Sequence, residues 1–307
     1  MKKIMLKQTN VKIPAISVCF MSIGDMETKA LAEHIDFCVE QGLNFFDHAD
    51  IYGGGTCETA FAKALKETDV KREDIFVQSK CGIVPGVMYD LSKDYILKSV
   101  DGILKRLDME YLDALVLHRP DALVEPEEVA EAFDKLAGSG KVRHFGVSNH
   151  KPMQIELLKR YVKQPIEIDQ LQLSIPCSNM ITNGLEVNMT TDGAADRDGS
   201  VLDYCRLHDL TIQAWSPFQY GFFEGVFIGN EEKYAKLNAV LRELAEKYSV
   251  TPSGIATAWI LRHPAGIQMI AGSTSRNHMQ EIIDGSNVTL TREEWYKLYL
   301  AADHMLP

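Results

Sequence analysis

Paired cysteines, long apolar runs and an excess of positive charge are all missing from this chain. Its six cysteines are scattered over 307 residues with no Cys-x-x-Cys pair, which is typical of reduced thiols in the cytoplasm. No stretch of 18 apolar residues is present, so we expect no membrane-spanning helix. Lys2 and Lys3 resemble the start of a signal peptide, but Lys7 soon interrupts the apolar residues that follow. We therefore expect a cytoplasmic protein.

The balance of charge narrows the range of partners. The chain has 32 Lys and Arg against 43 Asp and Glu, a net charge of −11. This negative charge disfavours nucleic acid and anionic membranes as partners, while a small phosphate-bearing ligand remains compatible with it. Apolar residues make up 46% of the chain, and no repeat or linker interrupts it. We predict one domain over residues 1–307, whereas no motif indicates the oligomeric state.

Short apolar segments of β character alternate with amphipathic segments almost to the end of the chain. Most are apolar on both faces, which favours a parallel sheet covered by helices. The predicted strands are Ala15–Met21, Leu43–Asp47, Ile75–Ser79, Leu112–His118, Val142–Val147, Ile168–Leu171, Thr211–Trp215 and Gln268–Ile270. Helices are predicted over Thr28–Gln41, Ser92–Leu107, Pro126–Ala137, Tyr234–Tyr248 and Arg292–Ala302. This alternation predicts an α/β fold, a closed (β/α)₈ TIM barrel.

Three further segments do not fit the alternation. Ile4–Leu6 and Val11–Ile13 predict a β-hairpin that could plug the amino-terminal face of the barrel. Ser174–Ser200 is polar with little periodicity, and Pro217–Glu232 is rich in glycine and aromatic residues. Both predicted loops follow the carboxyl ends of strands, where the active sites of such barrels lie.

Four reactive side chains lie at the ends of predicted strands or just after them, namely Asp47, Tyr52, Lys80 and His118. Reducing a carbonyl by hydride transfer places negative charge on its oxygen, which must then receive a proton. Tyr52 can donate that proton, and a nearby Lys80 ammonium is expected to lower the pKa of the phenol from its ordinary value of about 10. Asp47 can pair with Lys80, and His118 can hydrogen-bond the phenol or the substrate oxygen.

Each of the four residues also has an ordinary structural explanation. Asp47 could cap a helix, Lys80 could be a solvated charge, Tyr52 could be packed, and His118 could simply end a strand. Their convergence at one end of a barrel favours the catalytic interpretation. A metal-dependent hydrolase using Asp47, His48, Asp50 and His118 is less favoured, because Lys80 would place a cation among the ligands. We therefore predict no metal site.

The residues around this set resemble the aldo-keto reductase superfamily over essentially the whole chain, most of all its bacterial general oxidoreductases. The matching stretches are Phe46-Asp47-His48-Ala49-Asp50-Ile51-Tyr52-Gly53, Lys80 in Ser-Lys-Cys-Gly, His118 in Leu-His-Arg-Pro, and Gly140-Lys141-Val142-Arg143-His144-Phe145-Gly146-Val147-Ser148-Asn149. The resemblance implies a nicotinamide cofactor bound without a Rossmann domain and a small-molecule carbonyl substrate. Asp47, Tyr52, Lys80 and His118 match the catalytic tetrad of the family.

The resemblance also implies which residues bind the cofactor. Ser148, Asn149 and Gln170 would hydrogen-bond the nicotinamide carboxamide, and Trp215 would stack on its ring. Ser216, Phe218 and Gln219 would begin the loop over the pyrophosphate, and Gly272, Ser273 and Thr274 would lie at the adenosine end. Many members place an arginine where this chain has His278, whereas Arg276 lies two residues earlier. Arg276 is the better partner for a 2′-phosphate, and NADP (NADPH) is favoured over NAD.

Two functions remain open on this evidence. The first is an NADPH-dependent reductase of aldehydes or ketones, with Tyr52 as general acid. The alternative is a nicotinamide-binding regulatory subunit without significant turnover, since the superfamily includes potassium-channel β subunits. The physiological substrate and the direction of the reaction in the cell are not encoded in any motif.

Overall fold

The eight predicted apolar segments form a closed barrel of parallel strands in the computed structural model, which describes residues 1–307. Around the barrel the order of strands is β10-β11-β14-β3-β4-β5-β8-β9. Their bounds are β3 Ile16–Cys19, β4 Phe45–Asp47, β5 Phe76–Cys81, β8 Leu112–Leu117, β9 Val142–Ser148, β10 Ile166–Gln172, β11 Thr211–Trp215 and β14 Gln268–Ala271. The prediction of a (β/α)₈ barrel is confirmed.

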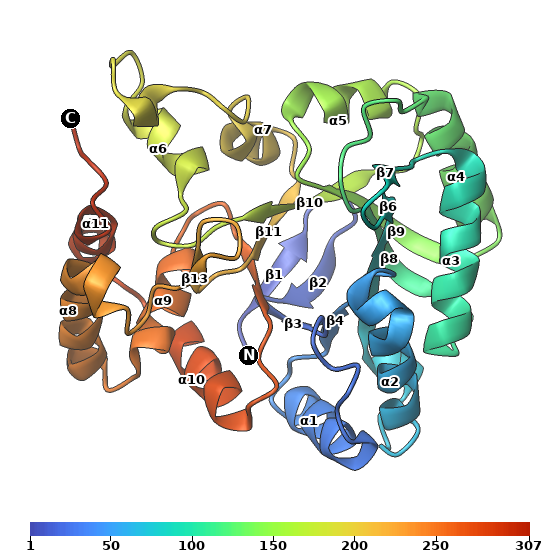
Figure 1. Ribbon diagram of the computed structural model, residues 1–307, viewed down its shortest axis with the longest axis horizontal. Helices are drawn as coiled ribbons and strands as arrows, with labels where there is room; N and C mark the ends of the chain where they lie inside the picture. Colours follow the sequence, from blue (N-terminus) through green and yellow to red (C-terminus); the bar gives the residue numbers. More distant parts are fainter.

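Helices surround the barrel in the ring seen in Figure 1. They are α1 Thr28–Glu40, α2 Thr56–Leu65, α3 Lys93–Leu107, α4 Pro126–Gly138, α5 Pro152–Lys159, α6 Asn179–Leu185, α7 Val201–Leu207, α8 Glu231–Tyr248, α9 Pro252–Leu261, α10 Arg276–Ser286 and α11 Arg292–Ala301. The five predicted helices are all present. Ser92 caps α3 by accepting a hydrogen bond from the Tyr95 backbone, which satisfies a donor that the first turn leaves free. None of the helices is long and apolar enough to cross a membrane.

The predicted amino-terminal hairpin closes one end of the barrel. Strands β1 (Lys3–Leu6) and β2 (Val11–Pro14) pair antiparallel and lie at the centre of the ring of helices in Figure 1. Leu6 and Ile13 are buried against Phe45, Val116 and Ile168, which point into the barrel. The loops and the candidate functional side chains lie at the other end of the barrel, where the strands finish.

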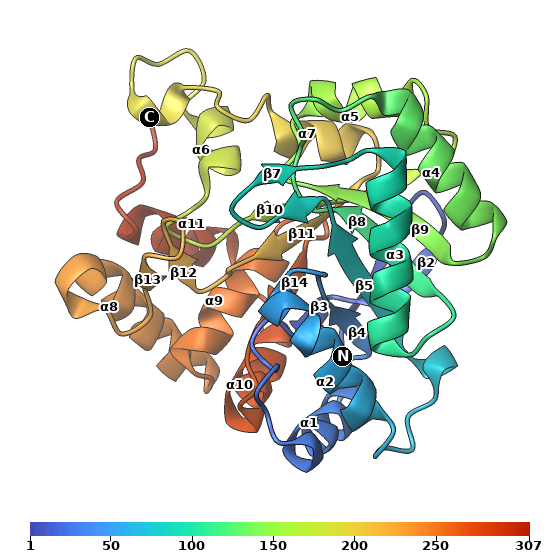
Figure 2. The same ribbon diagram turned by 45° about the vertical axis from the view of Figure 1, so that its right-hand side comes forward.

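The two long loops contain more regular structure than their composition indicated. Ser174–Ser200 includes α6 and a short 3₁₀ turn, and Pro217–Glu232 includes the antiparallel strands β12 (Gln219–Tyr220) and β13 (Gly225–Val226). A second unpredicted hairpin, β6 (Ile83–Val84) with β7 (Met88–Tyr89), follows β5 (Figure 2). Each of these strands has two residues, so an alternating pattern is too short to be visible in the sequence.

Candidate active site

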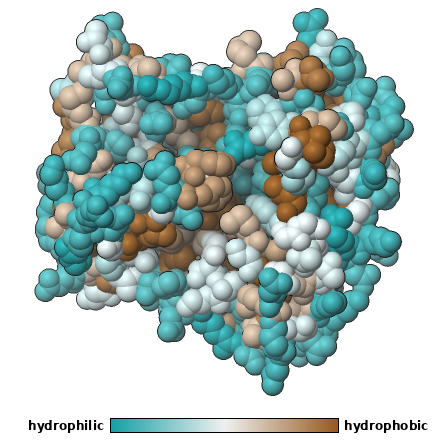
Figure 3. All heavy atoms as spheres, viewed as in Figure 1, coloured by the Kyte–Doolittle hydropathy of each residue, from teal (hydrophilic) through white to brown (hydrophobic).

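A cavity of about 1040 Å³ opens at the carboxyl ends of the barrel strands. Its volume is at the upper end of the range of small-molecule sites. In Figure 3 hydrophobic residues surround the hollow in the middle of this face. Thirteen of the sixteen residues predicted for the site line it, namely Asp47, Tyr52, His118, Ser148, Asn149, Gln170, Trp215, Ser216, Phe218, Gln219, Gly272, Ser273 and His278. Lys80 lies beneath the cavity, while Thr274 and Arg276 lie outside it.

Asp47 and Lys80 form a buried ion pair under the floor of the cavity. Asp47 ends β4 and Lys80 lies on the neighbouring β5, so both side chains point into the barrel. The Lys80 Nζ donates to Asp47 Oδ2 at 2.7 Å, to the His48 carbonyl at 2.8 Å and to Tyr52 Oη at 3.1 Å. Neither charged side chain is more than 1% exposed. All three donors of the ammonium are therefore used, and the third is directed at the tyrosine hydroxyl.

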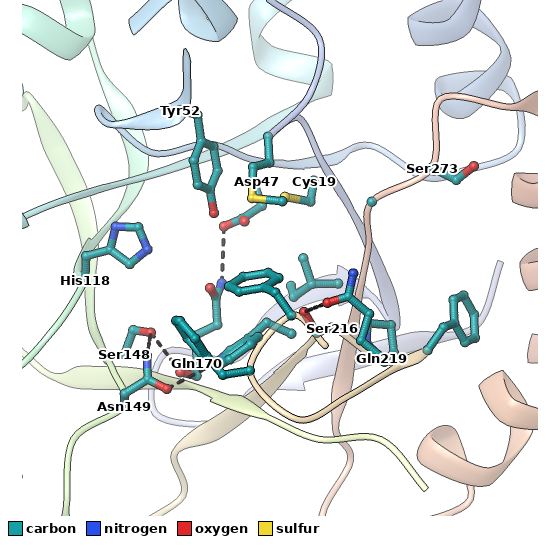
Figure 4. Close-up of a pocket in the computed structure, with 18 of the residues that line it drawn as sticks. Cys19, Asp47, Tyr52, His118, Ser148, Asn149, Gln170, Ser216, Gln219 and Ser273 are labelled. Carbon is teal, nitrogen blue, oxygen red and sulfur yellow. Dashed lines mark hydrogen bonds between the residues drawn. The ribbon is translucent and has the colours of Figure 1, made fainter. Parts of the chain in front are cut away.

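Tyr52 begins a short 3₁₀ turn just after β4, and its hydroxyl points down toward Asp47 in Figure 4. Burial raises the pKa of Tyr52 well above its ordinary value, and nearby Cys19 and Asp47 add to the effect. The net lowering of this pKa expected from Lys80 is therefore not found. Burial disfavours the phenolate and outweighs the effect of the ammonium, which Asp47 offsets in part at a distance of 2.7 Å. The hydroxyl is held protonated, which is the form that can donate a proton.

His118 follows β8 and faces Tyr52 across the cavity (Figure 4). The two rings meet edge to face with their centroids 6.1 Å apart, and no hydrogen bond joins them. Burial lowers the pKa of His118 well below its ordinary value, assisted by the positive charges of Lys80 and Arg119. Its Nδ1 is buried without a partner. His118 also lines the cavity in front of the tyrosine, so its neutral imidazole can hydrogen-bond a ligand there.

A network of glutamines holds Asp47 from below. Gln78 Nε2 donates to Asp47 Oδ1 at 2.6 Å, and Gln170 Nε2 donates to the same oxygen at 3.2 Å. Gln213 exchanges hydrogen bonds with Gln78 and donates to Gln268, which in turn donates to the Pro14 carbonyl. These amides lie on four different strands, so the carboxylate is fixed by the barrel as a whole.

The residues assigned by resemblance to the nicotinamide lie together on the floor of the cavity. Ser148 donates to the Gln170 carbonyl at 2.8 Å, and Asn149 donates to Ser148 Oγ at 2.7 Å. Trp215 Nε1 donates to Asn149 Oδ1 at 3.2 Å. Phe223, on the turn between β12 and β13, stacks on the indole with a centroid distance of 6.0 Å. Polar side chains that can hydrogen-bond a carboxamide thus lie beside an aromatic ring that can stack on a nicotinamide.

The remaining predicted contacts fall into two groups. Ser216, Phe218 and Gln219 line the cavity after β11, and Ser216 donates to the Gln219 side chain at 3.2 Å. At the far end, Gly272, Ser273 and His278 line the cavity near the start of α10, with Ser273 on the opposite side from His118 in Figure 4. Arg276 instead pairs with Glu33 at 3.1 Å on the surface. The arginine favoured for a 2′-phosphate is therefore directed away from the cavity.

Several lining residues were not predicted from the sequence. Cys19 ends the first barrel strand and Met21 follows it, Ile83 and Tyr89 come from the β6–β7 hairpin, and Arg119 follows His118. Their position at or after strand ends was the available signal. His48, considered as a metal ligand, packs instead against Phe20 and Phe61. No three His, Cys, Asp or Glu side chains are grouped closely enough to bind a metal.

Comparison with known proteins places this geometry in one family. The model of the Aldo/keto reductase family matches residues 20–300.

The chain belongs to the aldo/keto reductase family.

Among curated proteins this aldo/keto reductase is similar to the uncharacterized oxidoreductase YcsN of Bacillus subtilis, with 36% identity over 87% of this chain and 86% of that protein. It is also 31% identical to the 6-dehydroglucose reductase of Agrobacterium fabrum, over 87% of this chain and 86% of the relative. Among solved structures, the thermostable aldo-keto reductase Tm1743 in complex with the inhibitor epalrestat has a TM-score of 0.79. It shares 26% identity, over 98% of this chain and 100% of that one. These relatives support an oxidoreductase.

Proposed function

We propose that the protein reduces aldehydes or ketones with NADPH, and that Tyr52 is the general acid. The observation that supports this most strongly is the Tyr52 hydroxyl, which lies on the cavity, stays protonated and accepts a hydrogen bond from Lys80 at 3.1 Å. A tyrosine kept in this state has a proton to give and a fixed cation that stabilises the oxygen once the proton has left.

The residues present fit a nicotinamide cofactor. The Gln170 amide nitrogen donates to Asp47 and Gln213, which fixes the orientation of the amide. No protein donor contacts its amide oxygen, so that oxygen can accept from a carboxamide. Ser148 and Asn149 extend the same polar strip, and Trp215 offers an aromatic face. Ser273 and His278 would lie at the phosphate end, near the amino terminus of α10. A bound NADPH would supply the hydride.

The chain's own residues then handle the proton and the charge. Tyr52 donates its proton to the carbonyl oxygen of the substrate as negative charge develops there. The neutral His118 hydrogen-bonds the same oxygen and orients it toward Tyr52. Lys80 stabilises the negative charge left on the tyrosine oxygen, and Asp47 keeps the ammonium in place at 2.7 Å. All four roles are performed by side chains at the carboxyl end of the barrel, in the geometry described above.

NADPH consumption, measured by absorbance with a panel of aromatic and aliphatic aldehydes, tests the reductase. We expect turnover with at least one aldehyde, and we expect NADP to raise the melting temperature more than NAD because tighter binding stabilises more. Stabilisation by NADP without any oxidation of NADPH would favour a nicotinamide-binding regulatory subunit instead. No stabilisation by either dinucleotide would contradict both functions.

A further inference from the structure

Arg119 is a cation on the cavity wall that no protein group neutralises. The arginines Arg72, Arg106, Arg143, Arg206, Arg242 and Arg276 all pair with carboxylates. Arg119 forms no ion pair or hydrogen bond within the protein, and its guanidinium carbon lies 5.9 Å from the centre of the Phe222 ring. The side chain is half-buried and lines the cavity. None of its nitrogens is buried without a partner, so all five guanidinium donors are available to a ligand in the cavity.

The nearby acidic groups are already engaged. Asp47, the one carboxylate on the cavity lining, is bound to Lys80. Asp121, two residues after Arg119, accepts hydrogen bonds from the backbone N–H groups of Leu91 and Leu123. His118 adds no charge because its imidazole is neutral. The catalytic half of the cavity therefore has one uncompensated positive charge, in a protein whose net charge is −11.

Arg119 lies at the end of the cavity where the substrate is expected to bind. It directly follows His118 in the chain, so its backbone lies about 4 Å from that of the catalytic histidine. Ser273, at the end assigned to the phosphates, lies across the cavity from His118 in Figure 4. Apolar side chains from the two unpredicted hairpins, Ile83 and Phe222, also line the cavity. A ligand there would meet a cation together with apolar walls.

We propose that the preferred substrates are aldehydes or ketones that bear a carboxylate on an apolar body, and that Arg119 binds the carboxylate. This inference rests on the proposed reductase function. A carboxylate is favoured over a phosphate because the planar fork of one guanidinium matches two carboxylate oxygens. A phosphate dianion would call for a second cation, and no other Lys or Arg lines the cavity. Arg119 is thus a specificity-determining residue, and the chemistry itself remains with Tyr52.

The test compares 4-carboxybenzaldehyde with methyl 4-formylbenzoate, a neutral ester of the same shape, as substrates with NADPH. We expect the wild-type protein to have the higher kcat/KM for the carboxylate. Arg119→Gln should lower the ratio of the two kcat/KM values by roughly 10- to 100-fold, as expected for loss of a charge-assisted hydrogen bond. Arg119→Lys should retain part of the ratio. Lys98→Gln removes one positive charge from an exposed site on α3 and should change the ratio by less than about 2-fold.

A second measurement separates failure of this inference from failure of the proposed function. Calorimetric binding of 4-carboxybenzyl alcohol, with NADP present, requires no turnover and should weaken by the same factor in Arg119→Gln. If the aldehydes are reduced but the ratio is equal in wild type and Arg119→Gln, the carboxylate inference is wrong and the reductase stands. If neither aldehyde is reduced, the proposed reductase function is wrong, and binding of the alcohol then tests the role of Arg119 by itself. Equal binding to both proteins would overturn the role of Arg119 in either case.

Discussion

Replacing Lys80 by methionine tests the buried pair on which the site is built. The ammonium and the Asp47 carboxylate are 2.7 Å apart and almost fully buried. Removing one partner leaves the other charge without compensation in the barrel interior. We expect Lys80→Met to lower the free energy of unfolding by about 3–5 kcal/mol at pH 7, the usual cost of an unpaired buried charge. Gln78 and Gln170 would still donate to Asp47, which favours the lower part of that range.

A double-mutant cycle shows whether the cost comes from the pair. Asp47→Asn with Lys80→Met removes both charges, so the double variant should cost about as much as either single variant and give a coupling of about 3 kcal/mol. The assay is urea unfolding followed by tryptophan fluorescence, and Lys98→Met at an exposed position of α3 serves as a control expected to change stability by less than about 0.5 kcal/mol. Additive costs in the double variant would refute this account of the pair.

Two further predictions concern stability. Burial, with help from Glu58, raises the pKa of Asp50 from 3.8 to about 7. The native state therefore holds this proton more tightly, and stability is lost as pH rises between those values. The free energy of unfolding of Asp50→Asn, relative to that of the wild type, should thus rise by about 2–3 kcal/mol between pH 5 and pH 8. Urea unfolding of both proteins at each pH measures this difference, and a difference that does not change with pH would contradict the prediction. Gly285→Ala would drive a methyl group into the backbone of Gly254 and should cost about 3 kcal/mol. Gly138→Ala, with no neighbour within 4 Å, should be neutral or slightly stabilising, and equal costs for the two alanines would show that α9 and α10 do not pack this closely.

The barrel could be predicted because its strands are buried on both faces, which leaves short apolar runs between amphipathic helices. Thr211–Trp215 was predicted with the bounds that the structure has, and most other strands differ by one or two residues at an end. The two-residue strands around Met88 and Tyr220 could not be found, since their pairing depends on a turn and on neighbours outside the segment.

The convergence of Asp47, Tyr52, Lys80 and His118 was predictable for a related reason, because parallel strands end at the same face. The pKa shifts and ion pairs of the site were harder to predict from the sequence. The pKa of Tyr52 is raised by burial and by the nearby Cys19 and Asp47, and neither burial nor these contacts are local properties of the sequence. Arg276 turns toward Glu33, 243 residues away in the chain. The free guanidinium of Arg119 likewise becomes visible only when its surroundings are known.

The measurement that tests the central claim most directly is the turnover of Tyr52→Phe. Phenylalanine keeps the ring and removes the hydroxyl that Lys80 contacts at 3.1 Å. With an aldehyde that the wild-type protein reduces, we predict that kcat falls by roughly 10²- to 10⁴-fold, the usual share of general acid catalysis. The dissociation constant for NADPH, measured by quenching of tryptophan fluorescence, should change by less than about 3-fold because Tyr52 is assigned no cofactor contact. Reduction at the wild-type rate by Tyr52→Phe would contradict the assignment of Tyr52 as the proton donor.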